Sequence, residues 1–137
     1  MKKNGFSLIE LMIAVGIAAI LAAIAIPSYS AYVKRANRTD ATKSISVIAQ
    51  ALERCYTQNY TYVGCPAAVS PVASTQGYYT VTITLAPGPP SETYSINAVP
   101  ALPPQTTDAQ CTSFTVDSAG TQTTLPAGNV KTCWGST

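Results

Sequence analysis

The first part of this chain is a long apolar run with only two polar side chains in it. The run extends from Phe6 to Ile26, and its polar residues are Ser7 and Glu10. An apolar stretch of this length is sufficient for an α-helix to cross the hydrocarbon core of a bilayer. The pattern therefore predicts a membrane-spanning helix close to the N-terminus.

Apolar positions continue at helical spacing after Pro27. They are Ala41, Ile45, Ile48, Leu52 and Cys55, separated by four, three, four and three residues. This spacing places them on one face of a helix, and we expect the opposite face to carry Arg38, Lys43, Gln50 and Arg54. The pattern predicts one helix from Phe6 to about Cys55, bent where Pro27 removes a backbone hydrogen bond. Its apolar face needs a sheet to cover it.

The period of the pattern changes to two in the second half of the chain, where apolar residues alternate with threonine, serine or asparagine. The expected strands are residues 79 to 85, 94 to 98, 114 to 116 and 121 to 125. Residues 56 to 77 are expected to form a loop, since Pro66 and Pro71 discourage regular structure. Strands in succession after one helix predict an α+β fold, with the long N-terminal helix packed on a four-stranded antiparallel sheet.

Charged residues are scarce, and this limits the classes of function. The chain has 8 basic and 6 acidic residues and no histidine, and after residue 57 its charged residues are Glu92, Asp108, Asp117 and Lys131. Nucleic acid is not an expected partner, because phosphate binding needs several lysines or arginines. We expect Asp108 and Asp117 to serve turns rather than form a catalytic pair. With no histidine available as a general base, an enzyme is not expected, and neither is a cofactor.

The chain contains four cysteines, which are Cys55, Cys65, Cys111 and Cys133. Without histidine or a C-x-x-C motif they do not indicate a zinc site. An even number of cysteines in an exported domain indicates disulfide bonds instead. Three connectivities are open, and we prefer the local pairing, Cys55 with Cys65 and Cys111 with Cys133.

Glu10 is the most unusual residue of the apolar run. A carboxylate in such a segment costs about 2.5–3.5 kcal/mol, so its presence calls for a partner. Lys2 and Lys3 precede it in a short leader, and cleavage after Gly5 would create a new α-amino group on Phe6. A helix cannot easily fold its own terminus back onto that carboxylate. A neighbouring copy, shifted by about one turn, can bring its amine there, and this arrangement indicates self-assembly.

The segment Gly5-Phe6-Ser7-Leu8-Ile9-Glu10 resembles the class III signal of type IV prepilins, and residues 22 to 32 continue the pattern. The resemblance implies that a prepilin peptidase cleaves between Gly5 and Phe6 and N-methylates Phe6. It implies that Glu10 neutralises the Phe6 amine of an adjacent subunit. It also implies that the helix between Gly16 and Pro27 can lose its regular hydrogen bonding in the filament. The implied partners are other pilins in a homo- or hetero-polymer, the inner membrane and the pilus assembly platform.

The second half resembles type IVa pilins more loosely, in the order Tyr78-Tyr79-Thr80, Tyr94 to Ala98, Asp108, Cys111, Asp117, Gly120 and Cys133-Trp134. This order is most similar to the PilE-like branch, which in several bacteria is a minor pilin. The resemblance implies a leader (1–5), a transmembrane and polymerisation helix (6–27) and an exported head (28–137). The protein would lie in the inner membrane before assembly and in the extracellular pilus, or fimbrium, afterwards. The loop between Cys111 and Cys133 would be exposed and open to a host or surface ligand.

Several alternatives remain open at this point. The apolar run could be a secretory signal cleaved before Ile26, or a signal anchor in which Glu10 is merely tolerated near the interface. The protein could be a pseudopilin of a type II secretion system, although the major kind usually has a calcium-binding acidic loop. It could also be a displayed adhesin or DNA receptor, which overlaps with the pilin interpretation. The residues do not distinguish twitching motility, adhesion and DNA uptake.

Overall fold

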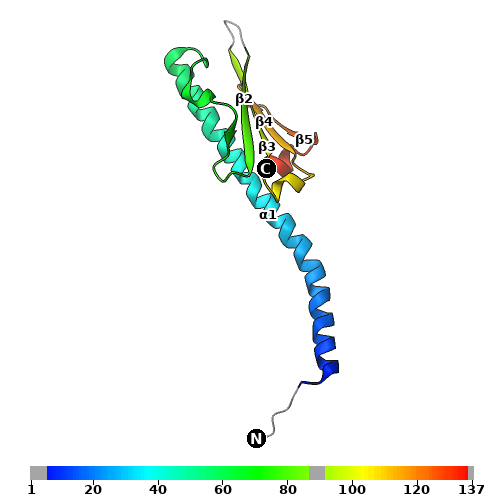
Figure 1. The fold of residues 1–137 in the computed structure, drawn as a ribbon. Helices are drawn as coiled ribbons and strands as arrows, with labels where there is room; N and C mark the ends of the chain where they lie inside the picture. The colour runs from blue at the N-terminus through cyan, green and yellow to red at the C-terminus, as the bar shows by residue number, and fades with distance from the viewer. Residues whose placement is uncertain (1–5, 87–91, 136–137) are drawn as a thin grey trace. The chain divides into compact units, whose positions relative to one another are not determined.

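The computed structural model describes residues 6–86 and 92–135 (Figure 1). One long helix, α1 (Leu8–Asn59), fulfils the expectation of a continuous helix and ends four residues beyond Cys55. The contacts divide the chain after Val33 into two units. The first unit contains the apolar half of α1, and the second contains the rest of α1 together with the sheet.

The first unit exposes its large apolar side chains. Phe6 is 78% exposed and Ile26 is 68% exposed, and the large aliphatic residues between them are exposed to a similar degree. Among the described residues, α1 is the helix that is long and apolar enough to cross a membrane. This surface therefore suits lipid or the helices of other chains. Pro27 lies inside α1, and the bend expected there stays a prediction.

In the second unit the described residues form an antiparallel sheet of five strands in sequential order. The strands are β1 (Val72–Ala73), β2 (Tyr79–Ala86), β3 (Thr93–Pro100), β4 (Ser113–Asp117) and β5 (Gln122–Leu125). The four expected strands are β2 to β5. Each pairs with the next along the chain, which is the topology that short connections favour.

The expectation of an irregular loop over residues 56 to 77 was wrong in part. This segment contains the 3₁₀ helix η1 (Pro66–Ala68) and the short strand β1, which pairs with Thr80 and Val81 of β2. The prolines exclude long elements but not a two-residue strand, because Pro71 lies just outside β1. A short C-terminal helix, α2 (Val130–Trp134), was also not expected, and it ends at Gly135 with a φ of 68°.

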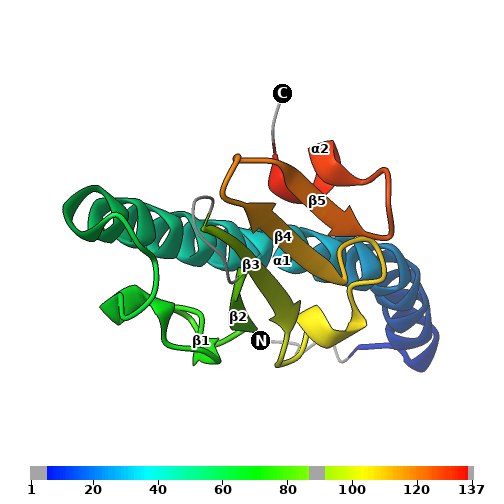
Figure 2. The same ribbon diagram turned by 90° about the horizontal axis from the view of Figure 1, so that it is seen from above.

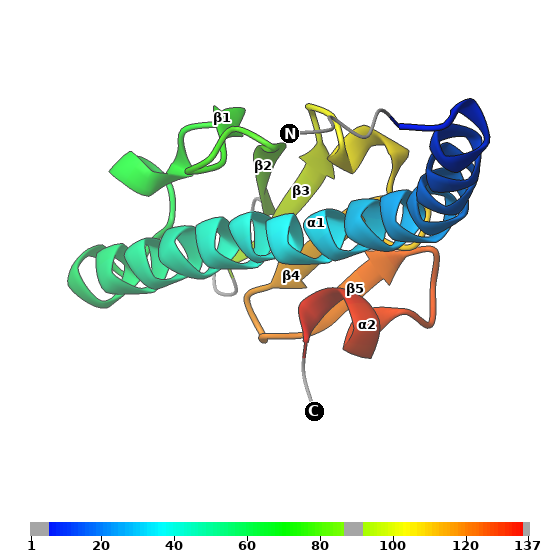
Figure 3. The same ribbon diagram turned by 90° about the horizontal axis from the view of Figure 1, so that it is seen from below.

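The core lies between the sheet and the part of α1 that belongs to this unit (Figure 3). Alternate side chains of β2, β3 and β4 face the helix, as the period of two predicts; they are Tyr79, Val81, Ile83, Tyr94, Ile96, Ala98, Phe114 and Val116. From α1 come Ala41, Ile45 and Leu52, which are almost fully buried. Each large apolar side chain buried here contributes about 1.5–3 kcal/mol relative to exposure.

Candidate functional site

The candidate assembly residues stand at the start of α1. Glu10 lies in the first turn of the helix, where the positive end of the helix dipole favours a carboxylate. Its side chain is exposed, and within the described residues of this single chain it forms no ion pair. Gly5 lies outside the described residues. The cleavage site and the Phe6–Glu10 pairing between copies therefore stay predictions.

A buried ion pair joins α1 to the connection between β3 and β4. The Arg38 Nε donates to Asp108 Oδ2 at 2.7 Å, and its Nη2 donates to Asp108 Oδ1 at 2.9 Å. Arg38 also donates to Gln110 Oε1 at 3.0 Å and to the Thr132 carbonyl at 3.4 Å. Both charged side chains are almost completely buried. The expectation that Arg38 lies on the polar face of the helix was therefore wrong.

The position of Arg38 has a simple geometric reason. It precedes Ala41 by three residues and Ile45 by seven, so it falls on the same face of α1 as the core positions. Asp108 supplies the opposite charge and also accepts the Gln110 amide at 3.2 Å, in the turn role that we expected. The ion pair thus holds the chain just before Cys111 against the helix.

A second buried carboxylate, Asp40, organises the turn that leads into β2. Its oxygens accept the Ser74 hydroxyl, the Gln76 amide at 2.9 Å and the Tyr78 amide at 3.3 Å. The Ser74 hydroxyl in turn accepts the Tyr79 amide at 2.9 Å. Three partners satisfy this buried charge, so its role is structural. The sequence pattern gives no sign of this role, because the partners of Asp40 are 34 to 38 residues away along the chain.

The cysteines form the pairs that we preferred. Cys55 is bonded to Cys65 with Cα atoms 6.0 Å apart, and Cys111 is bonded to Cys133 with Cα atoms 5.8 Å apart. The first bond joins the last turns of α1 to the segment before η1. The second joins the approach to β4 to α2. Each disulfide therefore fastens a segment that has few strand contacts of its own.

A tyrosine cluster stiffens the end of the head near the Cys55–Cys65 bond. The rings of Tyr56 and Tyr62 stack with centroids 4.6 Å apart, and Tyr94 meets Tyr62 edge-on at 5.0 Å. Burial, followed by the hydrogen bond to Glu53, raises the pKa of Tyr62 to about 12. The same causes raise the pKa of Tyr94. In the core, burial also raises the pKa of Tyr79 to about 12.

The other expected turn residue, Asp117, behaves as predicted. Its carboxylate accepts the Thr121 amide at 2.8 Å and the Ala119 amide at 3.0 Å in the turn between β4 and β5. These hydrogen bonds, with that from Thr121 the strongest, lower the pKa of Asp117. Among the described residues, no group of three His, Cys, Asp or Glu side chains is arranged to hold a metal ion.

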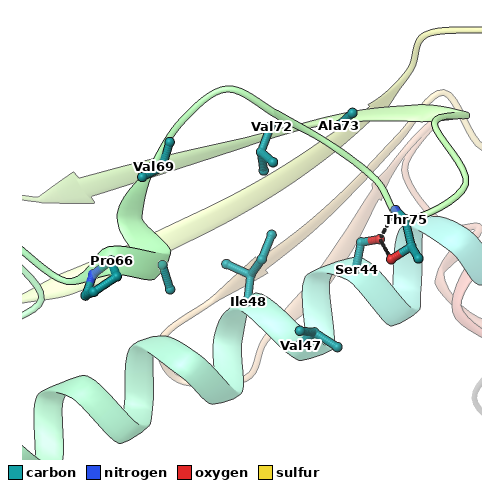
Figure 4. Close-up of a pocket in the computed structure, with 9 residues that line it drawn as sticks. Ser44, Val47, Ile48, Pro66, Val69, Val72, Ala73 and Thr75 are labelled. Carbon is teal, nitrogen blue, oxygen red and sulfur yellow. Dashed lines mark hydrogen bonds between the residues drawn. The ribbon is translucent and has the colours of Figure 1, made fainter.

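An apolar groove of about 260 Å³ lies between α1 and the segment that contains η1 and β1. Figure 4 shows Ile48 of α1 pointing towards this segment, with Val69 and Val72 on the other side, and Val47 also lines the groove. At one end the Ser44 hydroxyl accepts the Thr75 amide at 3.1 Å. The lining has no titratable side chain, so the groove is suited to apolar contact and not to acid–base chemistry.

Two segments of the chain match known protein families, and these matches identify the family to which the protein belongs. Residues 1–26 match the prokaryotic N-terminal methylation motif, and residues 27–115 match the family described as type IV minor pilin ComP, DNA uptake sequence receptor. The chain belongs to this family of type IV pilins. Its resemblance to type IV pilins is thereby confirmed. With its apolar N-terminal helix, the pilin is anchored in the membrane before assembly and becomes part of a surface pilus.

Individual relatives agree with this assignment. The pilin is 37% identical over 92 residues to the type IV major pilin protein PilE1 of Neisseria gonorrhoeae, covering 63% of this chain and 41% of that protein. It is 46% identical over 54 residues to the prepilin peptidase-dependent protein D of Escherichia coli K12, covering 39% of this chain and 37% of that protein. The pilin thus spans about two fifths of the length of these curated relatives.

A solved structure supports the fold. The high-resolution structure of a type IV pilin from Shewanella oneidensis matches with a TM-score of 0.52 and 33% sequence identity. The match covers 71% of this pilin and 96% of that chain. The expected fold, a long N-terminal helix on an antiparallel sheet, is confirmed, and the described residues form five strands where we expected four.

Proposed function

We propose that this pilin is a structural subunit of a type IV pilus, inserted in the membrane as a prepilin and polymerised through its N-terminal helix. The observation that carries the proposal is the single acid, Glu10, in an exposed apolar run that matches the N-terminal methylation motif. The relative from Neisseria gonorrhoeae and the solved structure from Shewanella oneidensis are both type IV pilins. This favours a pilus subunit over a pseudopilin of a secretion system.

Three parts of the chain have separate roles in this proposal. Residues 1–5 are the leader that the prepilin peptidase removes, residues 6–27 are the transmembrane and polymerisation helix, and residues 28–137 are the head. The inner membrane holds the precursor, and the assembly platform adds it to a polymer of the same or other pilins. The head then lies on the outside of the cell.

Charge neutralisation drives addition to the filament. The Glu10 carboxylate is poorly solvated in the membrane, and so is the amine of a processed Phe6 in a neighbouring copy. When they meet in apolar surroundings, a pair 4 Å apart gains about 4 kcal/mol at an effective dielectric constant of about 20. Apolar contacts along the rest of the helix then add to this directed interaction.

The test is recovery of the pilin from surface filaments. Filaments are sheared from cells that express the wild-type chain or the Gly5→Val variant, and an antibody against the head is used on both. We expect labelled filaments for the wild type alone, because the valine blocks the peptidase. Absence of the wild-type pilin from sheared filaments, together with its presence in the membrane fraction, would refute the proposal.

We propose DNA binding by the displayed head as a second function. It is favoured by the family match over residues 27–115, since that family is described as a DNA uptake sequence receptor. Nucleic acid was not an expected partner, and basic side chains in the described head are few. Arg38 is not available to DNA, because it is buried in the ion pair with Asp108. The exposed basic residues of the described head are Arg35, Lys43, Arg54 and Lys131. Three of these lie on α1, so DNA would contact this helix.

This second function predicts weak binding with a shallow dependence on salt. Each phosphate contact contributes about −0.9 to the log–log slope, so a few contacts give a small slope. We expect filaments with Lys43→Gln and Arg54→Gln to retain less duplex DNA at low salt than the wild type. The control variant, Lys131→Gln, should behave as the wild type. Equal retention by all three filament types would contradict DNA contact through α1.

A further inference from the structure

Three exposed valines line the apolar groove between α1 and the segment that contains η1 and β1. Val47 is 65% exposed, Val69 is 66% exposed and Val72 is 38% exposed. Figure 2 shows the segment with β1 beside α1, across the helix from β5 and α2. Single exposed apolar residues need no explanation, whereas apolar residues gathered around a hollow are typical of ligand sites. The groove is therefore a candidate site for an apolar ligand.

The two walls of the groove are fixed to each other at both of its ends. At one end the disulfide between Cys55 and Cys65 ties the start of the η1 segment to α1. At the other end the Ser44 hydroxyl of α1 accepts the Thr75 amide at 3.1 Å. Between these anchors, β1 is paired with β2. A groove with fixed walls binds a ligand without the entropic cost of ordering a loop, so this site is preformed.

A basic side chain flanks the groove and has no acidic partner among the described residues. Lys43 is exposed and precedes Val47 by four residues, so the two side chains are neighbours on the surface of α1. The nearest acid along the helix, Asp40, is buried and accepts hydrogen bonds from the turn before β2 instead. In the described part of the chain, no acidic side chain lines the groove. This surroundings favours a negative charge next to the apolar lining.

The size of the groove and the position of its polar end restrict the ligand further. Its volume of about 260 Å³ lies just below the range of about 300–1,000 Å³ that is typical of small-molecule pockets. A single alkyl chain of medium length suits this volume, and the paired chains of a phospholipid are too bulky for it. Ser44 and Thr75 form the polar end, and Lys43 adjoins Ser44 in α1. The charged end of a ligand belongs there.

We propose that this groove binds a medium-chain fatty acid, with its alkyl chain along the valines and its carboxylate beside Lys43. The inference goes beyond the proposed function and does not require polymerisation. Most of the affinity comes from removing the alkyl chain and the valine side chains from water. The ion pair with Lys43 is exposed, so it adds a smaller and salt-sensitive part, which orients the ligand and selects acids over neutral alkyl compounds.

Photolabelling of the full chain in lipid nanodiscs tests the proposal and locates the site. The probe is decanoate with a diazirine on its alkyl chain, and the labelled peptides are mapped by mass spectrometry. We expect labels in residues 44 to 48 and 66 to 73, which line the groove. Excess decanoate should displace them, and decanol should displace them less. Labels within residues 6 to 27 report probe in the bilayer and are counted separately.

Substitutions in the lining and at its flank provide the variants. Val47→Glu places a carboxylate in the groove and should lower groove labelling by about tenfold or more, because it repels the ligand's carboxylate and hydrates the lining. The matched control is Val63→Glu, at a valine that is 67% exposed and does not line the groove, and it should be labelled as the wild type. Lys43→Gln should lower labelling about two- to fivefold, as for an exposed ion pair, and Lys43→Arg should retain it.

Four results would overturn the proposal. Absence of groove labels in the wild type, or equal loss of labels in both glutamate variants, would exclude the site. Equal displacement by decanol and decanoate would exclude recognition of the carboxylate. Labelling of the same residues by a diazirine phospholipid would assign the groove to a membrane lipid, and loss of the labels when several chains share a nanodisc would assign it to a second copy. None of these results bears on filament assembly, which substitution of Glu10 tests separately.

Discussion

Arg38 and Asp108, 70 residues apart in the chain, form a bidentate ion pair between the guanidinium and the carboxylate. Both side chains are almost completely buried. One belongs to α1 and the other to the connection that precedes Cys111. The pair therefore fixes the start of the disulfide-bonded region to the part of α1 that belongs to the same unit.

Removal of one partner of this pair should strongly destabilise the head. Arg38→Met leaves the Asp108 carboxylate buried without its countercharge, and the expected loss is about 3–5 kcal/mol in the free energy of unfolding. The double variant, Arg38→Met with Asp108→Leu, should be less destabilised than the single variant, because no charge remains unpaired. The measurement is denaturant unfolding of the detergent-solubilised chain, followed by near-UV circular dichroism. A double variant that is no more stable than the single one would contradict this account.

The longer disulfide should stabilise the head more than the shorter one. Cys111–Cys133 spans a sequence separation of 22 residues and Cys55–Cys65 a separation of 10. On the chain-entropy model they contribute roughly 3.4 and 2.7 kcal/mol respectively. We expect Cys111→Ser with Cys133→Ser to lower the denaturant midpoint more than Cys55→Ser with Cys65→Ser. A non-reduced peptide map of the exported wild type should show these two pairs, and a crossed pair would refute the connectivity.

Stability of the head should fall at high pH. The pKa values of Tyr62 and Tyr79 are about 12 in the folded chain, against 10.0 for an unperturbed tyrosine. Below pH 10 both the folded and the unfolded chain keep these protons, so the stabilisation is fully present. As the pH rises from 10 towards 12, the unfolded chain loses them first, and the free energy of unfolding decreases.

Absorbance of ionised tyrosine provides the measurement for this pH dependence. In a titration of the folded chain, Tyr62 and Tyr79 should keep their protons until the pH approaches 12 or the head unfolds. Tyr79→Phe should make the decline of stability above pH 10 less steep. Ionisation of all eight tyrosines in one step near pH 10, with the head still folded, would be incompatible with this prediction.

Processing should occur between Gly5 and Phe6. Residues 1–26 match the N-terminal methylation motif, which is the basis of this prediction. Mass spectrometry of the filament subunit should find N-methylphenylalanine as the first residue, and Gly5→Val should leave the leader in place. A mature chain that begins at Ile26 would instead establish a cleaved secretory signal.

Periodicity was sufficient to predict the main elements of this fold. The alternation of Tyr79, Val81 and Ile83 with threonines predicted β2, and the spacing from Ala41 to Leu52 predicted the buried face of α1. These patterns are reliable because each side of an element meets one environment, either the core or the solvent. Strand β1 was missed because a two-residue strand has no period.

The polar contacts between distant segments could not be predicted in the same way. The charge of Arg38 favours the solvent face of α1, whereas its spacing from Ala41 places it with the core residues. A buried arginine requires a specific partner, and Asp108 could not be identified as that partner without the fold. The role of Asp40 likewise depends on a turn that only the folded chain brings to the helix.

Incorporation of the Glu10→Val variant into surface filaments tests the assembly mechanism most directly. The substitution makes the helix more apolar, so membrane insertion and cleavage after Gly5 should continue. A neighbouring Phe6 amine would then be buried without its countercharge, which typically costs about 3–5 kcal/mol. Ser7→Val is the matched control, since it also replaces a polar residue of the run.

The measurement is the amount of the pilin in sheared filaments relative to the membrane fraction, in cells that lack the wild-type copy. We predict that Glu10→Val accumulates in the membrane and is depleted from filaments, while Ser7→Val is incorporated as the wild type is. Normal incorporation of Glu10→Val would contradict the account.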